Sequence, residues 1–107
     1  MRLLRPEADR LGCVRSDDLG AHAGRFVRFA GLLAAARQVP TRQGELRFLT
    51  MEDEDGLIEA VLFPGANARL AAGLTTPGPF LAGGMVRDEQ GEVHLVLSEL
   101  RPFHERP

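Results

Sequence analysis

The sequence predicts an all-β fold with one short helix: a small barrel of five strands in which the helix lies between strands three and four. Five segments are rich in branched and aromatic residues and are bounded by turn residues, as strands are. An Ala-rich stretch, residues 65–72, separates the third segment from the fourth. Glycines stand in the middle of the first and fourth segments, where a small barrel needs a strand to bend.

The first strand is expected over Arg25–Arg37, with its bend at Gly31. Ala34–Ala36 favours helix by propensity, but Pro40 soon breaks the chain and the preceding pattern is typical of a strand. We therefore predict that the alanines continue the strand. Gln38–Gly44 is expected to be a loop.

The second and third strands flank an acidic turn that ends in glycine. Aspartates recur in such turns because their side chains hydrogen-bond the turn backbone, and glycine adopts the backbone angles of a chain reversal. The fourth strand carries a second bend at adjacent glycines. The expected segments are strand two, Glu45–Met51; turn, Glu52–Gly56; strand three, Leu57–Phe63; strand four, Phe80–Arg87 with Gly83 and Gly84; turn, Asp88–Gly91; and strand five, Glu92–Leu100.

Three parts of the chain are expected. Residues 1–24 form an N-terminal extension with a short helix, begun by Ser16 as N-cap, that covers one end of the barrel. Residues 25–101 form the barrel, and residues 102–107 form a polar tail.

Length and composition indicate one globular domain in the cytoplasm. The chain has 107 residues, of which 44% are apolar, and no apolar run is long enough to span a membrane. The first residues lack the apolar core of a secretory signal. A single cysteine, Cys13, excludes an internal disulfide and fits a reducing compartment.

All thirteen basic residues are arginine, yet the formal net charge is −2. Arginine forks onto phosphates and stacks on bases, which lysine does less well. Dedicated nucleic-acid binders are usually basic, so any such binding by this chain is expected to be weak or to depend on a local arginine patch.

Five strands with a helix after the third describe an OB-fold, a five-stranded Greek-key barrel. Five motifs stand out, at residues 27–33, 37–41, 48–56, 62–64 and 83–87. With these motifs the chain resembles, over residues 12–100, the OB domain near the C-terminus of the bacterial DNA polymerase III alpha subunit, and the Arg-Gln-x-Pro stretch at residues 37–40 is similar to that of its error-prone paralogue. The resemblance implies contact with single-stranded DNA along the template path.

Phe48 is the sharpest candidate for a binding residue. Alternation along a strand places Leu46, Phe48 and Thr50 on one face and Leu49 and Met51 on the other. Leu49 and Met51 suit the core, which leaves Phe48 on the open face where OB-folds receive bases. Stacking on an aromatic ring is worth roughly 1–3 kcal/mol per base. The alternative is that Phe48 fills the core.

Arg37, at the end of the first strand, and Arg42, in the following loop, are expected to meet phosphates or a base, with Arg28 and Arg47 as weaker candidates. The alternative for each of these arginines is an ordinary solvated surface side chain without a binding role. Glu59 matches a base-reading position in the anticodon-binding relatives of this group, although the polymerase resemblance favours a structural or electrostatic role for it.

The sequence contains no catalytic constellation, so we expect a non-enzymatic module without cofactor or metal. The module is expected to be either a domain of a larger polymerase chain or a free-standing relative of such a domain. Glu52–Asp55 lacks the spacing of a calcium loop, and the histidines and Cys13 have no zinc spacing. Cys13 also has no evident base beside it, and no phosphate-binding glycine loop occurs.

Three functions follow as hypotheses. The first is weak binding of single-stranded DNA, alongside replication or translesion proteins and without a membrane. The second is an interaction or spacer domain that has kept the fold and lost tight binding, which the negative charge favours. The third is an anticodon-type RNA binder, which fits the acidic hairpin but not the Arg-Gln-x-Pro stretch.

Overall fold

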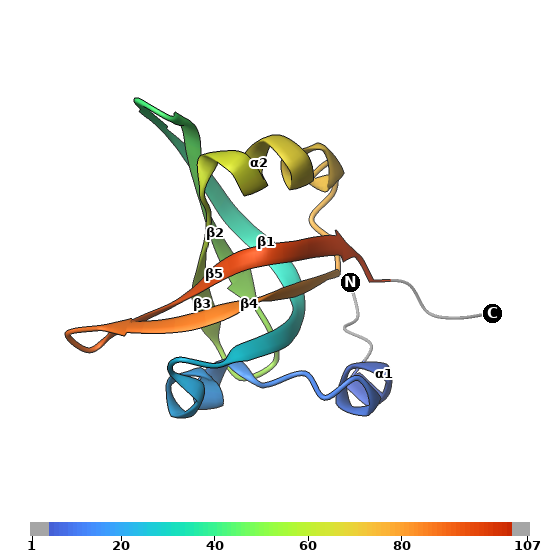
Figure 1. Ribbon diagram of the computed structural model, residues 1–107. Helices are drawn as coiled ribbons and strands as arrows, with labels where there is room; N and C mark the ends of the chain where they lie inside the picture. The colour runs from blue at the N-terminus through green and yellow to red at the C-terminus, as the bar shows by residue number, and fades with distance from the viewer. Residues whose placement is uncertain (1–4, 104–107) are drawn as a thin grey trace.

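The computed structural model describes residues 5–103 and shows the predicted barrel (Figure 1). Its strands follow the order β1-β2-β3-β5-β4 and close on β1. All neighbouring strands are antiparallel except β3 and β5, which are parallel. The strands are β1 Phe26–Thr41, β2 Gly44–Glu52, β3 Leu57–Leu62, β4 Phe80–Glu89 and β5 Glu92–Pro102. Helix α2, Pro64–Leu70, and a 3-10 turn, η2 Ala71–Gly73, lie between β3 and β4, as expected.

Strand β1 is shared by both halves of the barrel. Up to Gly31 it pairs with β4, and from Leu32 onward it pairs with β2. A Cβ atom on Gly31 would lie 2.5 Å from the carbonyl oxygen of Glu52, so only glycine permits this approach. An irregularity in register follows between Leu33 and Ala35, which places the bulge slightly beyond the predicted bend.

The alanine run is part of β1, as predicted, but the loop expected over Gln38–Gly44 is wrong. Strand β1 continues to Thr41, and the β1–β2 connection is the tight turn at Arg42 and Gln43. Pro40 stands within the strand, opposite Glu45. The pairing of β1 with β4 ends at Gly31, so beyond that residue one edge of β1 has no partner strand. Proline is tolerated at such an unpaired edge because no hydrogen bond to a neighbouring strand is required of its nitrogen.

The barrel interior is filled by alternate residues of all five strands. Strand β4 bends between Gly83 and Gly84, where its register with β5 shifts, as predicted. A Cβ atom on Gly84 would lie 2.0 Å from the carbonyl oxygen of Val96. The largest side chains that are fully buried are Phe29, Phe80, Leu49, Met51, Leu62, Leu95 and Val86.

The N-terminal segment folds back onto the barrel. A 3-10 helix, η1 Ser16–His22, covers one end and buries Leu19 in the core. Ser16 is not its cap: the hydroxyl donates instead to Oδ1 of Asp53 at 2.6 Å. The capping role predicted for Ser16 is wrong because Asp53, 37 residues further along the chain, binds its hydroxyl. Rules based on neighbouring residues cannot predict so distant a partner. Helix α1, Arg5–Arg10, was not predicted.

The acidic β2–β3 turn anchors this segment. Asp53 accepts hydrogen bonds from the backbone nitrogens of Ser16, Asp55 and Gly56 as well as from the Ser16 hydroxyl. Arg5 donates two hydrogen bonds to Glu54, at 2.7 and 2.8 Å. The turn therefore acts as a docking point for residues 5–16.

A small second core lies outside the barrel. Ala8 of α1 packs with Ala30, Leu81 and Phe103, and Cys13 borders the cluster. Phe103 is buried and Pro102 still belongs to β5, whereas residues 104–107 of the expected polar tail lie outside the described part. The division at residues 24 and 101 stays a prediction. Within residues 5–103, no helix has the length and apolarity to cross a bilayer.

Replacing Gly84 with alanine is expected to destabilise the barrel strongly. The added methyl would collide with backbone, which cannot move aside as a side chain can. The loss in unfolding free energy should reach or exceed the upper end of the ~1–3 kcal/mol typical of overpacking. Gly65→Ala is the matched control, because its Cβ meets nothing within 4 Å and alanine favours helix α2. Urea unfolding of both variants tests this; equal stabilities would contradict it.

Stability is expected to fall in acid through Glu54. The hydrogen bonds from Arg5 lower the pKa of Glu54 from 4.5 to about 2. Because the pKa is depressed in the folded state, the stabilisation is present above about pH 4.5 and is lost as the pH falls toward about 2. The Glu54 side chain is 39% exposed, so salt should weaken the effect.

Urea unfolding across this pH range measures it. Glu54→Gln should flatten the acid dependence, whereas Glu92→Gln should keep it, since no ion pair joins Glu92 to residues 5–103. Identical profiles for wild type and Glu54→Gln would refute the assignment.

Candidate nucleic-acid interface

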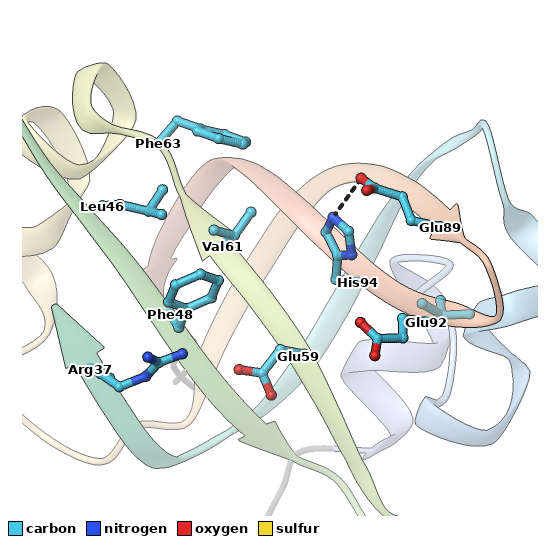
Figure 2. A pocket seen from close by; sticks show the side chains of 10 residues that line it. Arg37, Leu46, Phe48, Glu59, Val61, Phe63, Glu89, Glu92 and His94 are labelled. Atoms are coloured by element: carbon cyan, nitrogen blue, oxygen red, sulfur yellow. Dashed lines mark ion pairs between the residues drawn. The ribbon is translucent and has the colours of Figure 1, made fainter. Parts of the chain in front are cut away.

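A groove of about 760 Å³ opens on the outer face of β2 and β3 and is bounded on the far side by the start of β5 and the end of β4 (Figure 2). The β1–β2 hairpin contributes the cationic and apolar wall, and the β4–β5 hairpin contributes the acidic wall. The lining residues are Arg37, Leu46, Phe48, Glu59, Val61, Phe63, Glu89, Glu92, Val93 and His94.

Strand alternation places Phe48 in this groove. Its neighbour Leu49 and the next core residue, Met51, are fully buried inside the barrel. Phe48 and Thr50 therefore point the other way, and Phe48 is half-buried. The open-face position expected for Phe48 is the one the structure shows, whereas its role in binding stays a proposal.

Arg37 lies over the ring of Phe48. The two residues are directly opposite each other on β1 and β2, and the guanidinium carbon of Arg37 is 4.6 Å from the ring centroid. This is a cation–π contact. Arg37 has no ion pair with a side chain of residues 5–103, so its positive charge remains available to a ligand in the groove. Arg37 and Phe48 together present a planar, positively charged surface to the groove.

The opposite wall is acidic. Glu59 stands beside His94 in the parallel pairing of β3 with β5. Nε2 of His94 lies 3.6 Å from a carboxylate oxygen of Glu89, and Glu92 follows in the same hairpin (Figure 2). The groove is therefore polarised, with a cation on the β1–β2 side and three carboxylates toward β5. These carboxylates disfavour a phosphate at the end of the groove beside the β4–β5 turn, where Glu89 and Glu92 lie.

The other predicted arginines have different surroundings. Arg42 is exposed at the tip of the β1–β2 hairpin, on the same side of the groove as Arg37. Arg47 is not in the groove: its Nε donates to Oδ1 of Asn67 at 2.8 Å and so fastens helix α2 to β2. Arg28 lies on the first half of β1 and pairs with Glu99 at 3.2 Å. The structure brings Arg37 and Phe48 together in the groove, whereas Arg42 lies beyond it in the hairpin turn, and Arg28 and Arg47 have partners elsewhere.

Sequence reasoning placed Leu46 on the face of Phe48 but missed three other groove residues with a clear role in its shape: Val61, Phe63 and His94. Strand alternation along β3 could have placed Val61 on the outward face, between the buried Ala60 and Leu62. His94 required knowledge that β5 lies parallel to β3, which is a property of the closed barrel and has no local signal.

The part of the chain from residue 5 to 103 holds no group of three His, Cys, Asp or Glu side chains placed to hold a metal ion. In the acidic turn, the oxygens of Asp53 are already engaged by four donors. Burial raises the pKa of the Cys13 thiol, so the reactive thiolate is disfavoured there. These observations assign no chemistry to the turn or to Cys13.

Comparison with known proteins identifies the sequence relatives. The chain is 35% identical over 105 residues to an error-prone DNA polymerase of Corynebacterium efficiens, covering 96% of this chain and 10% of that protein. It is 39% identical over 81 residues to a DNA polymerase III subunit alpha of Halalkalibacterium halodurans, covering 74% of this chain and 7% of that protein. The chain is homologous to a segment of these polymerases. It spans about a tenth of their length or less. No protein-family model matches it.

Solved structures agree on the fold. The asparaginyl-tRNA synthetase from Pyrococcus horikoshii complexed with asparaginyl-adenylate superposes with a TM-score of 0.65 at 19% identity, over 85% of this chain and 22% of that one. The second OB-fold domain of replication protein A from Methanococcus maripaludis superposes with a TM-score of 0.53 at 13% identity, over 80% and 89%. The polymerase-like segment is thus an OB-fold, as its sequence predicted.

Phe48→Ala is expected to lower the melting temperature much less than Leu49→Ala. Leu49 is fully buried, and truncating such a leucine costs about 2–5 kcal/mol, whereas Phe48 borders the solvent-filled groove. Thermal unfolding of the two neighbouring variants makes the comparison within one strand. A loss at Phe48 equal to that at Leu49 would mean that Phe48 acts as a core residue.

Proposed function

We propose that this chain is a non-catalytic OB module that binds single-stranded DNA weakly in the groove of β2 and β3. The observation that carries the proposal is the stack of Arg37 on Phe48 at 4.6 Å, outside the core and open to the groove. A base that enters the groove can extend this stack over the guanidinium or displace it and meet the ring. Both contacts are tolerant of sequence, because every base has a π-face.

The charges of the groove orient the strand. Phosphates are favoured on the β1–β2 side, where Arg37 and Arg42 carry unpaired positive charge among residues 5–103. Bases then point toward Val61 on the floor and toward the acidic wall, whose carboxylates accept hydrogen bonds and repel phosphates. With only two arginines for phosphate and a net charge of −2, binding is weak.

Homology supports the setting. The sequence relatives are DNA polymerases, so the proposed context is replication or translesion synthesis in the cytoplasm, beside the proteins that act there. A tRNA synthetase shares the fold, which makes single-stranded RNA the natural competing ligand in a binding test. The polymerase chemistry of the relatives is not proposed for this chain, because the segment holds no carboxylate cluster for metal ions within residues 5–103.

The acidic wall favours a second candidate, an interaction or spacer domain with little affinity for nucleic acid. Glu59, Glu89 and Glu92 line the same groove as Phe48 and oppose a polyanion. In that case the apolar floor would receive a basic protein segment. The two candidates differ in one observable, which is binding of oligonucleotides at low salt.

Phe48→Ala and Arg42→Ala are expected to weaken binding to oligo-dT in different ways. Loss of stacking should cost roughly 1–3 kcal/mol and leave the salt dependence nearly unchanged. Loss of a phosphate contact should reduce the slope of log K against log[salt] by about 0.7. Fluorescence anisotropy with labelled oligo-dT and oligo-U, at several salt concentrations, measures both quantities and the DNA preference.

Arg69→Ala is the matched control, since Arg69 is an exposed arginine of helix α2 that neither lines the groove nor belongs to the β1–β2 hairpin. It should keep the wild-type affinity and slope. Absence of wild-type binding at low salt would contradict the proposal and support the interaction domain. Tighter binding of oligo-U than of oligo-dT would support the RNA alternative.

A further inference from the structure

We infer that a strand held at Phe48 continues around the barrel to a second stacking site, formed by Phe26 and Arg28 on the first half of β1. This inference rests on the proposed function and extends it to a surface that the groove does not include. It follows from a cross-strand row that joins the two sites and from a second contact between an arginine and a phenylalanine at its far end.

The row is set by the strand register. Phe48 on β2 faces Val61 on β3, Val61 faces Val96 on β5, and Val96 faces Met85 on β4. Met85 in turn faces Phe26 on β1. Directly opposite residues of neighbouring strands project from the same face of a sheet. An apolar row therefore runs across the outward face of the strands from Phe48 to Phe26, with Val61 buried, Phe48 and Val96 half-buried, and Met85 and Phe26 exposed.

Phe26 repeats the arrangement seen at Phe48. Its side chain is 45% exposed, and the guanidinium carbon of Arg28 lies 5.5 Å from its ring centroid. The ring also lies against Gly83, where an added Cβ would come within 3.0 Å of the Phe26 Cζ atom. This contact with the sheet holds the ring in place while leaving it accessible. Met85 beside it is 40% exposed.

The surrounding charges fit a polyanion with planar groups. Arg87 lies two residues beyond Met85, on the same face of β4, and neither Arg87 nor Arg25 has an ion pair with residues 5–103. Glu99 is the acid close to the ring, and Arg28 already offsets its charge at 3.2 Å. A purely apolar protein segment laid over Phe26 would leave Arg87 and Arg25 uncompensated, whereas phosphates would pair with them.

The separation of the two rings fits a short single strand. Four steps between strands, at about 4.8 Å each, place them roughly 19 Å apart along the surface. A stacked strand advances about 3.4 Å per nucleotide and would need about six nucleotides to cover that distance. This lies within the roughly 4–16 nucleotides that OB-folds occupy.

The sequence offers a direct test, because the chain contains no tryptophan and no tyrosine. Single-tryptophan variants Phe48→Trp, Phe26→Trp and Leu57→Trp each report on one surface site, and a base that stacks on the indole quenches its fluorescence. Leu57 is the control: it is 60% exposed on β3, beside the acidic turn and off the row. The probes are dT10, which can span the row, and dT3, which cannot.

We expect dT10 to quench Phe48→Trp and Phe26→Trp at the same concentration, dT3 to quench only Phe48→Trp, and neither to quench Leu57→Trp. Phe26→Leu, which keeps an apolar cover over Gly83, should weaken dT10 binding by about tenfold at an unchanged melting temperature and leave dT3 binding unaltered. Phe26→Tyr should restore the dT10 affinity.

Quenching of Phe48→Trp alone, or equal affinities of wild type and Phe26→Leu for dT10, would overturn the second site and leave the proposed function intact. Absence of quenching at Phe48→Trp would instead contradict the proposed function. Equal quenching of all three variants would mean non-specific association and would also overturn the inference.

Discussion

The close approach of backbones at Gly31 and Gly84 is the constraint on which the rest of the structure depends. At Gly31, β1 leaves β4 and joins β2, and a carbonyl oxygen occupies the space that a side chain would need. At Gly84, β4 bends against β5 in the same way. Without these two bends the five strands would not close, and the two edge strands would expose unpaired backbone groups.

Closure also creates the functional face. Once the barrel is closed, one side of every strand fills the interior, and the residues between must face outward. Phe48 lies outside because Leu49 and Met51 lie inside. The apolar row from Phe48 to Phe26 has a related origin, since its five members come from five different strands and are aligned by the pairings that lead from β2 through β3, β5 and β4 to β1.

The molecule separates its structural charges from its surface charges. The carboxylates of the β2–β3 turn are engaged by Arg5, Arg15 and the backbone, and they hold the N-terminal segment in place. The arginines around the groove have no acidic partner within residues 5–103, and the acids of the β4–β5 hairpin are concentrated on the opposite wall. The net charge of −2 therefore does not predict the local charge of either wall of the groove. The positive β1–β2 side and the acidic β4–β5 side have to be considered separately.

The sequence by itself determined the five strands, the helix after the third and the glycine bends, because each depends on alternation, propensity or the missing Cβ of glycine. Alternation also set Phe48 on the face opposite to Leu49 and Met51, but the tertiary structure decided that the face of Leu49 and Met51 is the core. The continuation of β1 through Pro40, the docking of Ser16 on Asp53 and the approach of His94 to Glu59 were decided only by the tertiary structure. The continuation of β1 through Pro40 depends on which edge of β1 has no partner strand, and that is known only once the strands are paired. The other two join residues more than thirty positions apart, and no local pattern encodes such a contact.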